Sequence, residues 1–522
     1  MLTTIFIIIG LILILSTLIR IAQKKRATLS IIPKPEIPEG IKPVITIIID
    51  SLMDAPLQDA IHVDKAPALQ FLMKNGTYYP RIVSSFPTMS VVIDSTLLTG
   101  SMPSEHGIYG LCYYDEQTKQ FWNFGTGAKE SITFGIKRVL TASMMMFNQR
   151  LLSKKVRTIH EEIPYDTASI NAVVYRGKTE HQIHSPFFTW ILGLLPRKIR
   201  TMAPTIFSFG SMHPISSLSE PSGTIARFGV NDRFTAMEMQ SLIQTGRVPI
   251  YSVLYFPGND DHVHQNGIAT IKGIEKADLE IQTILNTFPT WEEAISRYTW
   301  IVLGDSGQTN TLPSSQRAYI RLDTTLSPYQ IKPPNLDKPR EGDQIVLAVN
   351  ERMAYVHIID PSLSRLDIAT TLQSNPDLDL IVWKEENTYQ VISGTLPGKL
   401  QFEKEGPYLD EYGQSWQLRG DLSLLDITLS EDQTTIQYNA YPDPFYRLVS
   451  ALHISENVII VTATTGCEIV YGSSPTHKGA SHGSLHHLDS LVPMIVVGTT
   501  EAPRHKRIVD LKEWMIRLTK TN

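Results

Sequence analysis

Apolar residues in this chain occur in short, unbroken runs that alternate with helical patterns. The first run, Val44–Ile49, consists of β-branched residues, which is typical of a strand buried on both faces of a parallel sheet. Similar runs follow at Ile250–Phe256, Thr299–Leu303, Asn457–Thr462 and Pro493–Val497. Helical spacing lies between them, for example over Ala66–Lys74 and Ile271–Leu285. Strands alternating with helices predict an α/β fold with a doubly wound, mostly parallel sheet flanked by helices.

The pattern changes between residues 342 and 444. The apolar runs there are short, are separated by polar turns and carry more charge. Because the earlier pattern resumes afterwards, we interpret residues 342–444 as an α+β cap subdomain. It would be inserted into a core formed by residues 44–341 and 445–522.

The N-terminus has the composition of a membrane anchor. Met1–Ile19 contains no charge and is long enough to cross a bilayer as a helix. No basic residue precedes it and no small-residue cleavage motif follows it, which argues against a cleaved signal peptide. We predict a transmembrane anchor over residues 1–26 and a proline-containing linker over residues 27–43. Arg20 and Lys24–Arg26 follow the apolar run, so the positive-inside tendency places the globular part on the cytoplasmic side of the cell membrane.

The overall composition indicates a globular protein and argues against a nucleic-acid partner. A hydrophobic content of 42% and a charged content of 19% are those of an ordinary globular protein. The net charge of −5 supplies no basic field for a nucleic-acid backbone, so no nucleic-acid partner is expected. Cys112 and Cys467 cannot form a disulfide framework, and neither lies in a CxxC motif.

Two acidic residues follow predicted strands. Asp50 comes directly after Val44–Ile49, and Asp305 follows Thr299–Leu303 across one glycine. Ligands bind beyond the carboxyl ends of strands in open α/β sheets, so both acids are candidates for a binding crevice. The alternative role for such an acid is to cap a helix.

Two hydroxyl residues, Thr88 and Ser90, lie where a loop enters a helix that we expect to begin near Val91. Backbone N–H groups and the helix dipole at such a place can hold a phosphate beside a hydroxyl nucleophile. Simple N-capping is the alternative.

Two histidine-containing segments have the composition of a metal site. Asp260 and His264 are four residues apart, so one helical turn would put carboxylate and imidazole on the same side, as zinc binding requires. A solvated polar loop is the alternative. His482 lies in Gly479–His487 (GASHGSLHH), whose small residues would let the backbone approach a metal.

Taken together in their order along the chain, these motifs resemble those of the type I phosphodiesterase / nucleotide pyrophosphatase family of the alkaline phosphatase superfamily. The shared elements are an Asp after the first strand, FPTMS with LLTG and HGI within Phe86–Ile108, Asp-x3-His, a strand followed by Asp-x-Gly, and a late SHG. The Phe86–Ile108 block is the most specific. The resemblance covers Val44–Arg340 and His453–Val497, and it implies an alkaline-phosphatase-like core.

The resemblance also implies two divalent metal ions, of which Asp260, His264 and His482 match the ligands of one. Asp50 and Asp305 match ligands of the other, which also contacts the nucleophile. Ser90 falls on the nucleophile position and is therefore a ligand of that second ion as well.

Two residues depart from the family pattern. Ser306 stands where the family has a histidine after the second acid, and Leu111 stands where it has a phosphate-binding asparagine. The ligand set points to zinc, with manganese as the alternative that a Ser306 oxygen would suit better.

The expected activity is hydrolysis of a phosphodiester or nucleotide pyrophosphate through a phosphoserine at Ser90. Alternatives within the superfamily are a phosphomonoesterase, a phosphonate hydrolase and a transferase of a phospho head group, the last favoured by the anchor. An alternative of another class is a non-catalytic membrane protein that binds a phosphorylated ligand in the same cleft. The expected substrate is a phosphorylated small molecule or a lipid head group.

Deletion of residues 1–26 should give a soluble, active protein, because the anchor precedes a linker and not a core strand. Gel filtration and phosphoester turnover check this outcome. Failure of the truncated chain to fold would contradict it. Protease protection of the intact protein in spheroplasts tests the cytoplasmic orientation.

Overall fold

The computed structural model describes residues 34–215, 227–313 and 318–520. The predicted anchor, residues 1–26, lies outside them, as does part of the linker. Among the residues that are described, no helix is both long and apolar enough to cross a membrane. The anchor and its orientation therefore stay predictions.

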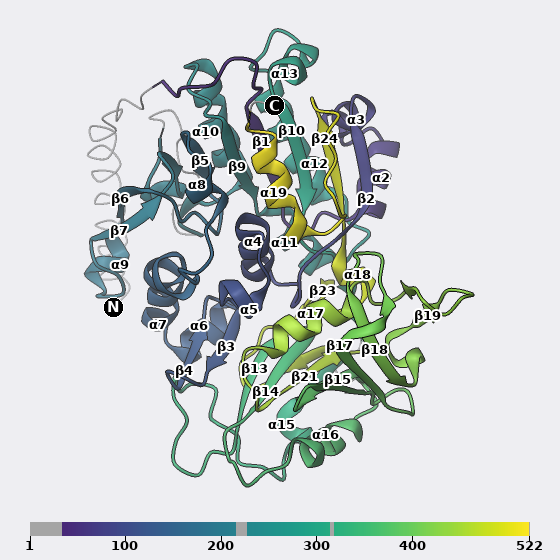
Figure 1. The fold of residues 1–522 in the computed structure, drawn as a ribbon. Helices are drawn as coiled ribbons and strands as arrows, with labels where there is room; N and C mark the ends of the chain where they lie inside the picture. The colour runs from purple at the N-terminus through teal and green to yellow at the C-terminus, as the bar shows by residue number, and fades with distance from the viewer. Residues whose placement is uncertain (1–33, 216–226, 314–317, 521–522) are drawn as a thin grey trace.

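A seven-stranded sheet forms the centre of the upper part of the molecule in Figure 1. Its order is β2 (Thr77–Val83), β24 (Leu491–Val497), β10 (Thr299–Gly304), β1 (Val44–Ile49), β9 (Tyr251–Phe256), β5 (Thr167–Ile170) and β8 (Ile206–Ser208). The strands from β10 to β8 are parallel, whereas β24 and β2 pair antiparallel at one edge. The predicted mostly parallel sheet is confirmed.

Helices cover both faces of this sheet because successive side chains of β1 point to opposite sides. Ile45, Ile47 and Ile49 pack with α2 (Asp54–His62), α3 (Pro67–Lys74), α10 (Asp232–Gln244) and α12 (Lys272–Leu285). Val44 and Ile48 pack with α4 (Ser90–Thr99), α8 (Ile159–Glu162) and α19 (Leu511–Arg517). The result is a three-layer α/β/α core.

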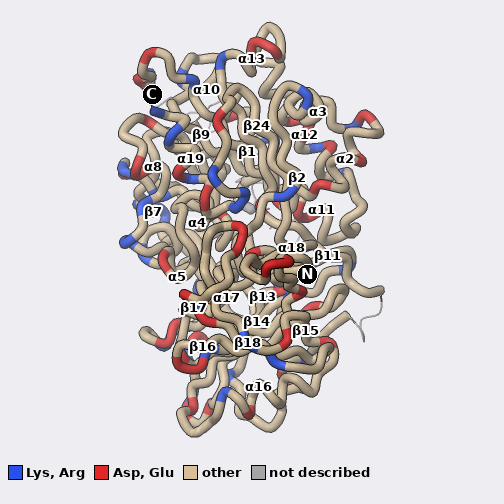
Figure 2. Tube along the Cα trace, turned by 45° about the vertical axis from the view of Figure 1, so that its right-hand side comes forward, with Lys and Arg blue, Asp and Glu red and all other residues tan. Residues whose placement is uncertain are grey.

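A second seven-stranded sheet lies below the first in Figure 1 and is antiparallel throughout. Its order is β13 (Ile345–Asn350), β14 (Met353–Ile358), β21 (Val458–Ala463), β15 (Leu378–Glu385), β16 (Thr388–Ile392), β17 (Leu400–Leu409) and β18 (Ser415–Gly420). Residues of α17 (Pro444–Leu452) pack on one face and residues of α16 (Arg365–Gln373) on the other. Charged residues of both signs are spread over the upper and lower parts (Figure 2).

One strand differs from its predicted place. The run Asn457–Thr462 was expected in the core sheet, but β21 pairs with β14 and β15 in the second sheet. An unbroken apolar run indicates burial on both faces, and β21 has that burial because helices cover both faces of the second sheet. Residues 445–522 thus contribute strands to both sheets.

Shorter elements complete the described chain: α5 (Pro103–His106), β3 (Cys112–Asp115), β4 (Gln120–Asn123), α6 (Ala128–Phe134), α7 (Ile136–Thr141), a π-helix (Ala142–Leu151), β6 (Thr179–His184), α9 (Phe187–Ile191), β7 (Lys198–Ala203), α11 (Gly258–Asn266), α13 (Trp291–Arg297), β11 (Thr309–Asn310), β12 (Tyr319–Arg321), α15 (Leu322–Thr325), β19 (Ile427–Leu429), β20 (Ile436–Tyr438), β22 (Glu468–Val470), β23 (Ala480–Ser481) and α18 (His487–Ser490).

A buried ion pair joins the second sheet to the end of the core. Arg352 lies in the turn between β13 and β14, and its Nη1 is 2.6 Å from Oδ1 of Asp489 on α18. Both side chains are almost completely buried.

Replacing Arg352 by Met should destabilise the protein by about 3–5 kcal/mol, because Asp489 would remain buried without its partner charge. Urea denaturation of the truncated protein measures this loss. The double variant Arg352→Met with Asp489→Asn should recover part of it. A loss below about 1 kcal/mol for the single variant would contradict the prediction.

Candidate metal centre and active site

The predicted acidic residues meet at the carboxyl ends of three adjacent strands. Asp50 follows β1, Asp305 follows β10, and Asp260 lies on α11, which begins just after β9. In the parallel register, Ile49 of β1 is paired with both Gly304 and Phe256, the last residues of the neighbouring strands. Three chain segments far apart in sequence therefore deliver carboxylates to one place.

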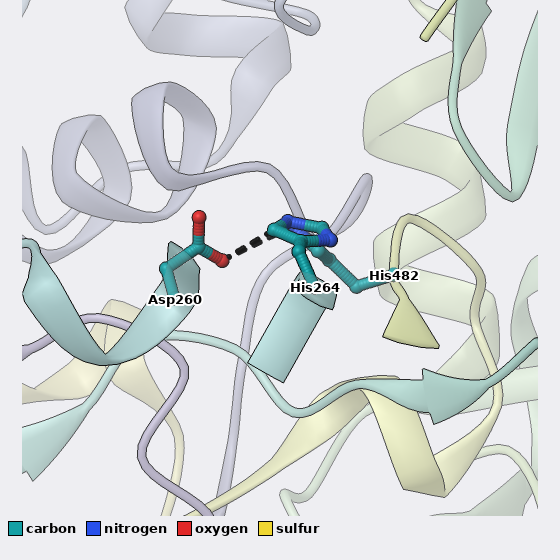
Figure 3. Close-up of side chains that lie close together, drawn as sticks. All are labelled: Asp260, His264 and His482. Atoms are coloured by element: carbon teal, nitrogen blue, oxygen red, sulfur yellow. Dashed lines mark ion pairs between the residues drawn. The ribbon is translucent and has the colours of Figure 1, made fainter. Parts of the chain in front are cut away.

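Asp260, His264 and His482 form a group that could hold a metal ion. Their ligand atoms all lie within 4.8 Å of one another. Asp260 Oδ1 is 3.1 Å from His264 Nε2 and 3.9 Å from His482 Nε2. Figure 3 shows Asp260 and His264 on their shared helix and His482 reaching them from a separate segment. The prediction that Asp260 and His264 share one side of a helical turn is confirmed.

Both histidines are oriented by backbone carbonyls. Nδ1 of His264 donates a hydrogen bond to the Ala480 carbonyl at 2.8 Å, and Nδ1 of His482 donates to the Thr88 carbonyl. The Nε2 atom of each ring therefore faces Asp260 as the available ligand atom. Metal-binding histidines usually donate their other ring N–H to a carbonyl or carboxylate in this way, so these residues fit a divalent ion.

The charged residues of this group shift one another's pKa values. Burial raises the pKa of Asp260, but the positive charges of His264 and His482 outweigh it and hold that pKa well below its usual value. Burial lowers the pKa of His264, but the charges of Asp260 and Glu351 outweigh it and raise that pKa to about 10. A proton on His264 thus balances the carboxylates, and metal binding would release it.

Ser90 lies at the start of α4 beside the first acid. Its Oγ donates a hydrogen bond to Asp50 Oδ1 at 3.4 Å, and the other oxygen of Asp50 accepts one from the Tyr255 hydroxyl. The side chain that the sequence identified as a nucleophile therefore contacts the acid that follows β1.

One carboxylate oxygen of Asp305 accepts hydrogen bonds, and the other accepts none from the described residues. Oδ1 accepts hydrogen bonds from the N–H groups of Ser51 at 2.8 Å and Ser306 at 2.7 Å. Oδ2 is buried and has no hydrogen-bond partner in the described part of the chain. Burial raises the pKa of this carboxyl. A buried, unpaired carboxylate oxygen is costly, and a bound cation would remove that cost.

A further carboxylate, Asp94, follows Ser90 by one helical turn on α4. It is fully buried, and within the described ranges neither of its oxygens has a hydrogen-bond partner. Burial and the charge of Asp305 both raise its pKa, which indicates that the two carboxyls are close enough to repel. The nucleophile side of the site thus holds one more buried carboxyl group than the sequence motifs predicted.

The structure shows what surrounds Ser306 and Leu111, the two residues that depart from the family pattern. The Ser306 hydroxyl lies 3.3 Å from that of Ser51. Leu111 is half-buried and packs against the cluster that contains α4.

Several polar residues of the same motifs have roles other than those of ligand or nucleophile. Thr88 is buried, and its hydroxyl accepts a hydrogen bond from Gly483 N–H at 2.8 Å. Thr88 therefore connects the nucleophile loop to the His482 segment. His486 and His487 lie at the start of α18 with their rings in tilted contact, outside the group of His482.

Ser51 and Gln308 were missed by the sequence analysis. Gln308 Nε2 donates to Asp260 Oδ1 and to Ser51 Oγ, each at 2.8 Å, and Ser51 Oγ donates to Asp260 Oδ1 at 2.9 Å. These bonds join the two halves of the site. The sequence could have indicated both residues, because Ser51 directly follows Asp50 and Gln308 closely follows Asp305.

A second group that could hold a metal ion was also missed. It consists of His264, Glu351 and His477 and shares His264 with the first group. His477 precedes His482 by five residues, which is a usable signal. Glu351 lies in the predicted cap, and nothing in its sequence neighbourhood marks it.

Comparisons with known proteins identify the family of this chain and support its fold. Residues 44–484 match the profile of the family described as type I phosphodiesterase / nucleotide pyrophosphatase. No curated protein matches the chain.

Two solved structures illustrate the shared fold. Murine ectonucleotide pyrophosphatase / phosphodiesterase 5, inactive and in complex with AMP, has a TM-score of 0.53 and 13% identity, with 92% of this chain and 95% of that chain covered. Phosphonoacetate hydrolase from Sinorhizobium meliloti 1021, in complex with phosphonoacetate, has a TM-score of 0.54 and 14% identity, with 93% and 97% covered. The predicted alkaline-phosphatase-like α/β fold is supported.

His264→Ala and His482→Ala should each lose one metal ion, because each variant removes one of the two imidazole ligands of the group. Metal analysis of the purified variants after loading with zinc measures this. His486→Ala, close in sequence but outside the group, is the matched control and should keep the metal content of the parent. Parental metal content in His482→Ala would rule out that residue as a ligand.

Proposed function

The chain belongs to the type I phosphodiesterase / nucleotide pyrophosphatase family and is a phosphoric ester hydrolase, and we propose that it acts through a phosphoserine at Ser90 with two divalent metal ions. The observation that carries the proposal is the position of Ser90. It starts α4 and contacts Asp50, which follows β1 as the buried Asp305 follows the adjacent strand β10.

The residues divide into two ligand sets. Asp50, Asp305 and Ser90 would hold one ion, and the group of Asp260, His264 and His482 would hold the other. Bound there, the ions would lower the pKa of the Ser90 hydroxyl and neutralise charge on the phosphoryl oxygens and the leaving group.

The residues of the chain then perform a two-step displacement. Ser90 Oγ attacks phosphorus, so that an Oγ–P bond forms while the bond from phosphorus to the leaving oxygen breaks, and the leaving oxygen takes up the proton that the Ser90 hydroxyl loses. The N–H groups of the first turn of α4 and its dipole favour a phosphoryl group beside Ser90. In the second step, water attacks phosphorus, which releases the phosphate product and restores the Ser90 hydroxyl.

The two ligand sets favour different metals. Two imidazoles with a carboxylate suit zinc. The other set contains only oxygen ligands, since Ser306 replaces the histidine of the family pattern, and oxygen ligands suit manganese as well as zinc. We propose zinc for the histidine site and zinc or manganese for the Ser90 site.

A phosphodiester or nucleotide pyrophosphate is the substrate class that family membership favours. The solved structure in complex with phosphonoacetate supports phosphonate hydrolysis as a second candidate. A phosphomonoester remains a third, and the predicted anchor favours a lipid head group as acceptor or substrate. The alternative of a non-catalytic binder is disfavoured because Ser90 and the five proposed ligands converge.

Because of the predicted anchor, we also propose that the chain is a single-pass protein of the cell membrane whose catalytic part faces the cytoplasm.

A substrate screen with the truncated protein, residues 27–522, tests the function. The panel comprises p-nitrophenyl phosphodiesters and monoesters, nucleotide pyrophosphates and phosphonoacetate, each with added zinc or manganese. Turnover of none of them by metal-loaded protein would contradict the proposal.

Ser90→Ala should lower turnover of the best substrate by at least about 1,000-fold while metal content and folding persist, because only the nucleophile is lost. Mass spectrometry of acid-quenched enzyme should detect phosphate on Ser90 in the parent and none in the variant.

Thr88→Ala is the matched control within the same loop. It should keep measurable turnover and lose about 1 kcal/mol of stability with the hydrogen bond from Gly483. An inactive Thr88→Ala beside an active Ser90→Ala would show that Thr88 is the nucleophile.

A further inference from the structure

The turn between β13 and β14 brings the second sheet to the histidine side of the metal centre. Glu351 and Arg352 form this two-residue turn, and Glu351 has a φ of 56°, in the left-handed region. Arg352 N–H donates a hydrogen bond to the His482 carbonyl at 2.9 Å. Gly483 permits this approach, since a Cβ there would lie 2.4 Å from the Asn350 carbonyl oxygen. The turn and the His482 segment are therefore in direct contact.

Glu351 is buried, with 8% of its surface exposed, and it points at the proposed ligands. Its Oε2 accepts hydrogen bonds from Ser481 Oγ at 2.8 Å and His482 N–H at 3.3 Å. The same oxygen lies 3.9 Å from His482 Nε2, the atom that faces Asp260. A ligand atom of Glu351 also lies within 4.8 Å of one of His264.

The two groups that could hold a metal ion share His264, and this shared residue has one available nitrogen. Its Nδ1 is used by the Ala480 carbonyl, which leaves Nε2. Because one nitrogen binds one ion, the two groups cannot each hold an ion through His264 at the same time.

His477 is the less suitable ligand of the second group. Its Nδ1, which is 3.8 Å from Glu351, already pairs with Glu468 at 2.6 Å, and its ring stacks on His264 with centroids 4.0 Å apart. His477 therefore supports the ring of His264, and Glu351 is the member of the group that faces the ion.

We propose that Glu351 is a fourth ligand of the ion held by Asp260, His264 and His482, so that the second sheet completes the metal centre. The proposal rests on the metal chemistry of the proposed function. Ligand atoms around a tetrahedral zinc ion lie about 3.4 Å apart for bonds of about 2.1 Å. The pairs Asp260–His264, Asp260–His482 and His482–Glu351, at 3.1, 3.9 and 3.9 Å, lie within about 0.5 Å of that spacing.

The charge of this ligand set supports the same conclusion. Two carboxylates and two neutral imidazoles together carry two negative charges, which balance those of a divalent cation. A substrate oxygen would enter as a fifth ligand, a coordination number that catalytic zinc sites reach. The fourth ligand thus retains the ion while the site stays open to substrate.

Glu351→Gln in the truncated protein tests the proposal, because the glutamine carbonyl can still accept the hydrogen bonds of Ser481 and His482. Two measurements are needed: zinc affinity by competition with a chelator, and the visible absorption of the cobalt-substituted protein, which reports the ligands directly. Glu468→Gln is the matched control, since it also removes a buried carboxylate near His477.

Glu351→Gln should weaken one zinc-binding step by at least about tenfold and change the cobalt spectrum, while Glu468→Gln keeps the parental spectrum. An unchanged spectrum in Glu351→Gln, with or without weaker zinc binding, would overturn the proposal, because Glu351 would then act only through its hydrogen bonds. If the parent protein binds neither zinc nor cobalt, the proposed function itself fails.

Discussion

The concentration of buried negative charge where β1, β9 and β10 end is the constraint on which the site depends. Parallel strands deliver Asp50, Asp260 and Asp305 to one place, and such carboxylates repel each other in a medium of low dielectric constant. Backbone N–H groups, hydroxyls and an imidazole offset part of the repulsion. The unpaired oxygen of Asp305 and both oxygens of Asp94 show that protein groups alone do not complete the balance within the described residues.

The two halves of the site differ in ligand chemistry although Ser51 and Gln308 join them. One half offers two imidazoles with fixed tautomers, and the other offers carboxylate and hydroxyl oxygens. Ser306 offers this second half a hydroxyl, and Asp94 is a further buried acid on α4. As ligands, these oxygen atoms would suit a harder metal ion than the two imidazoles would.

The sequence predicted those features of the structure that depend on residues close together in the chain. The β-branched run Val44–Ile49, the acids at strand ends and the Asp260–His264 spacing all lie within a few residues, and the structure has them as expected. The sheet to which β21 belongs could not be predicted, because burial on both faces is the same in either sheet. Glu351 was missed for a related reason: its partners His482 and Ser481 come from a distant segment, so only the tertiary fold brings them together.

The position of β24 bears on the order in which the chain can fold during synthesis. This strand lies between β2 and β10, yet it is made from residues 491–497, near the end of the chain. On the ribosome, β10 therefore has an exposed edge until residues 491–497 have emerged, and the His482 segment appears only shortly before them. A chain without these residues consequently presents strand edges that can pair wrongly, and it cannot yet bring His482 to Asp260 and His264.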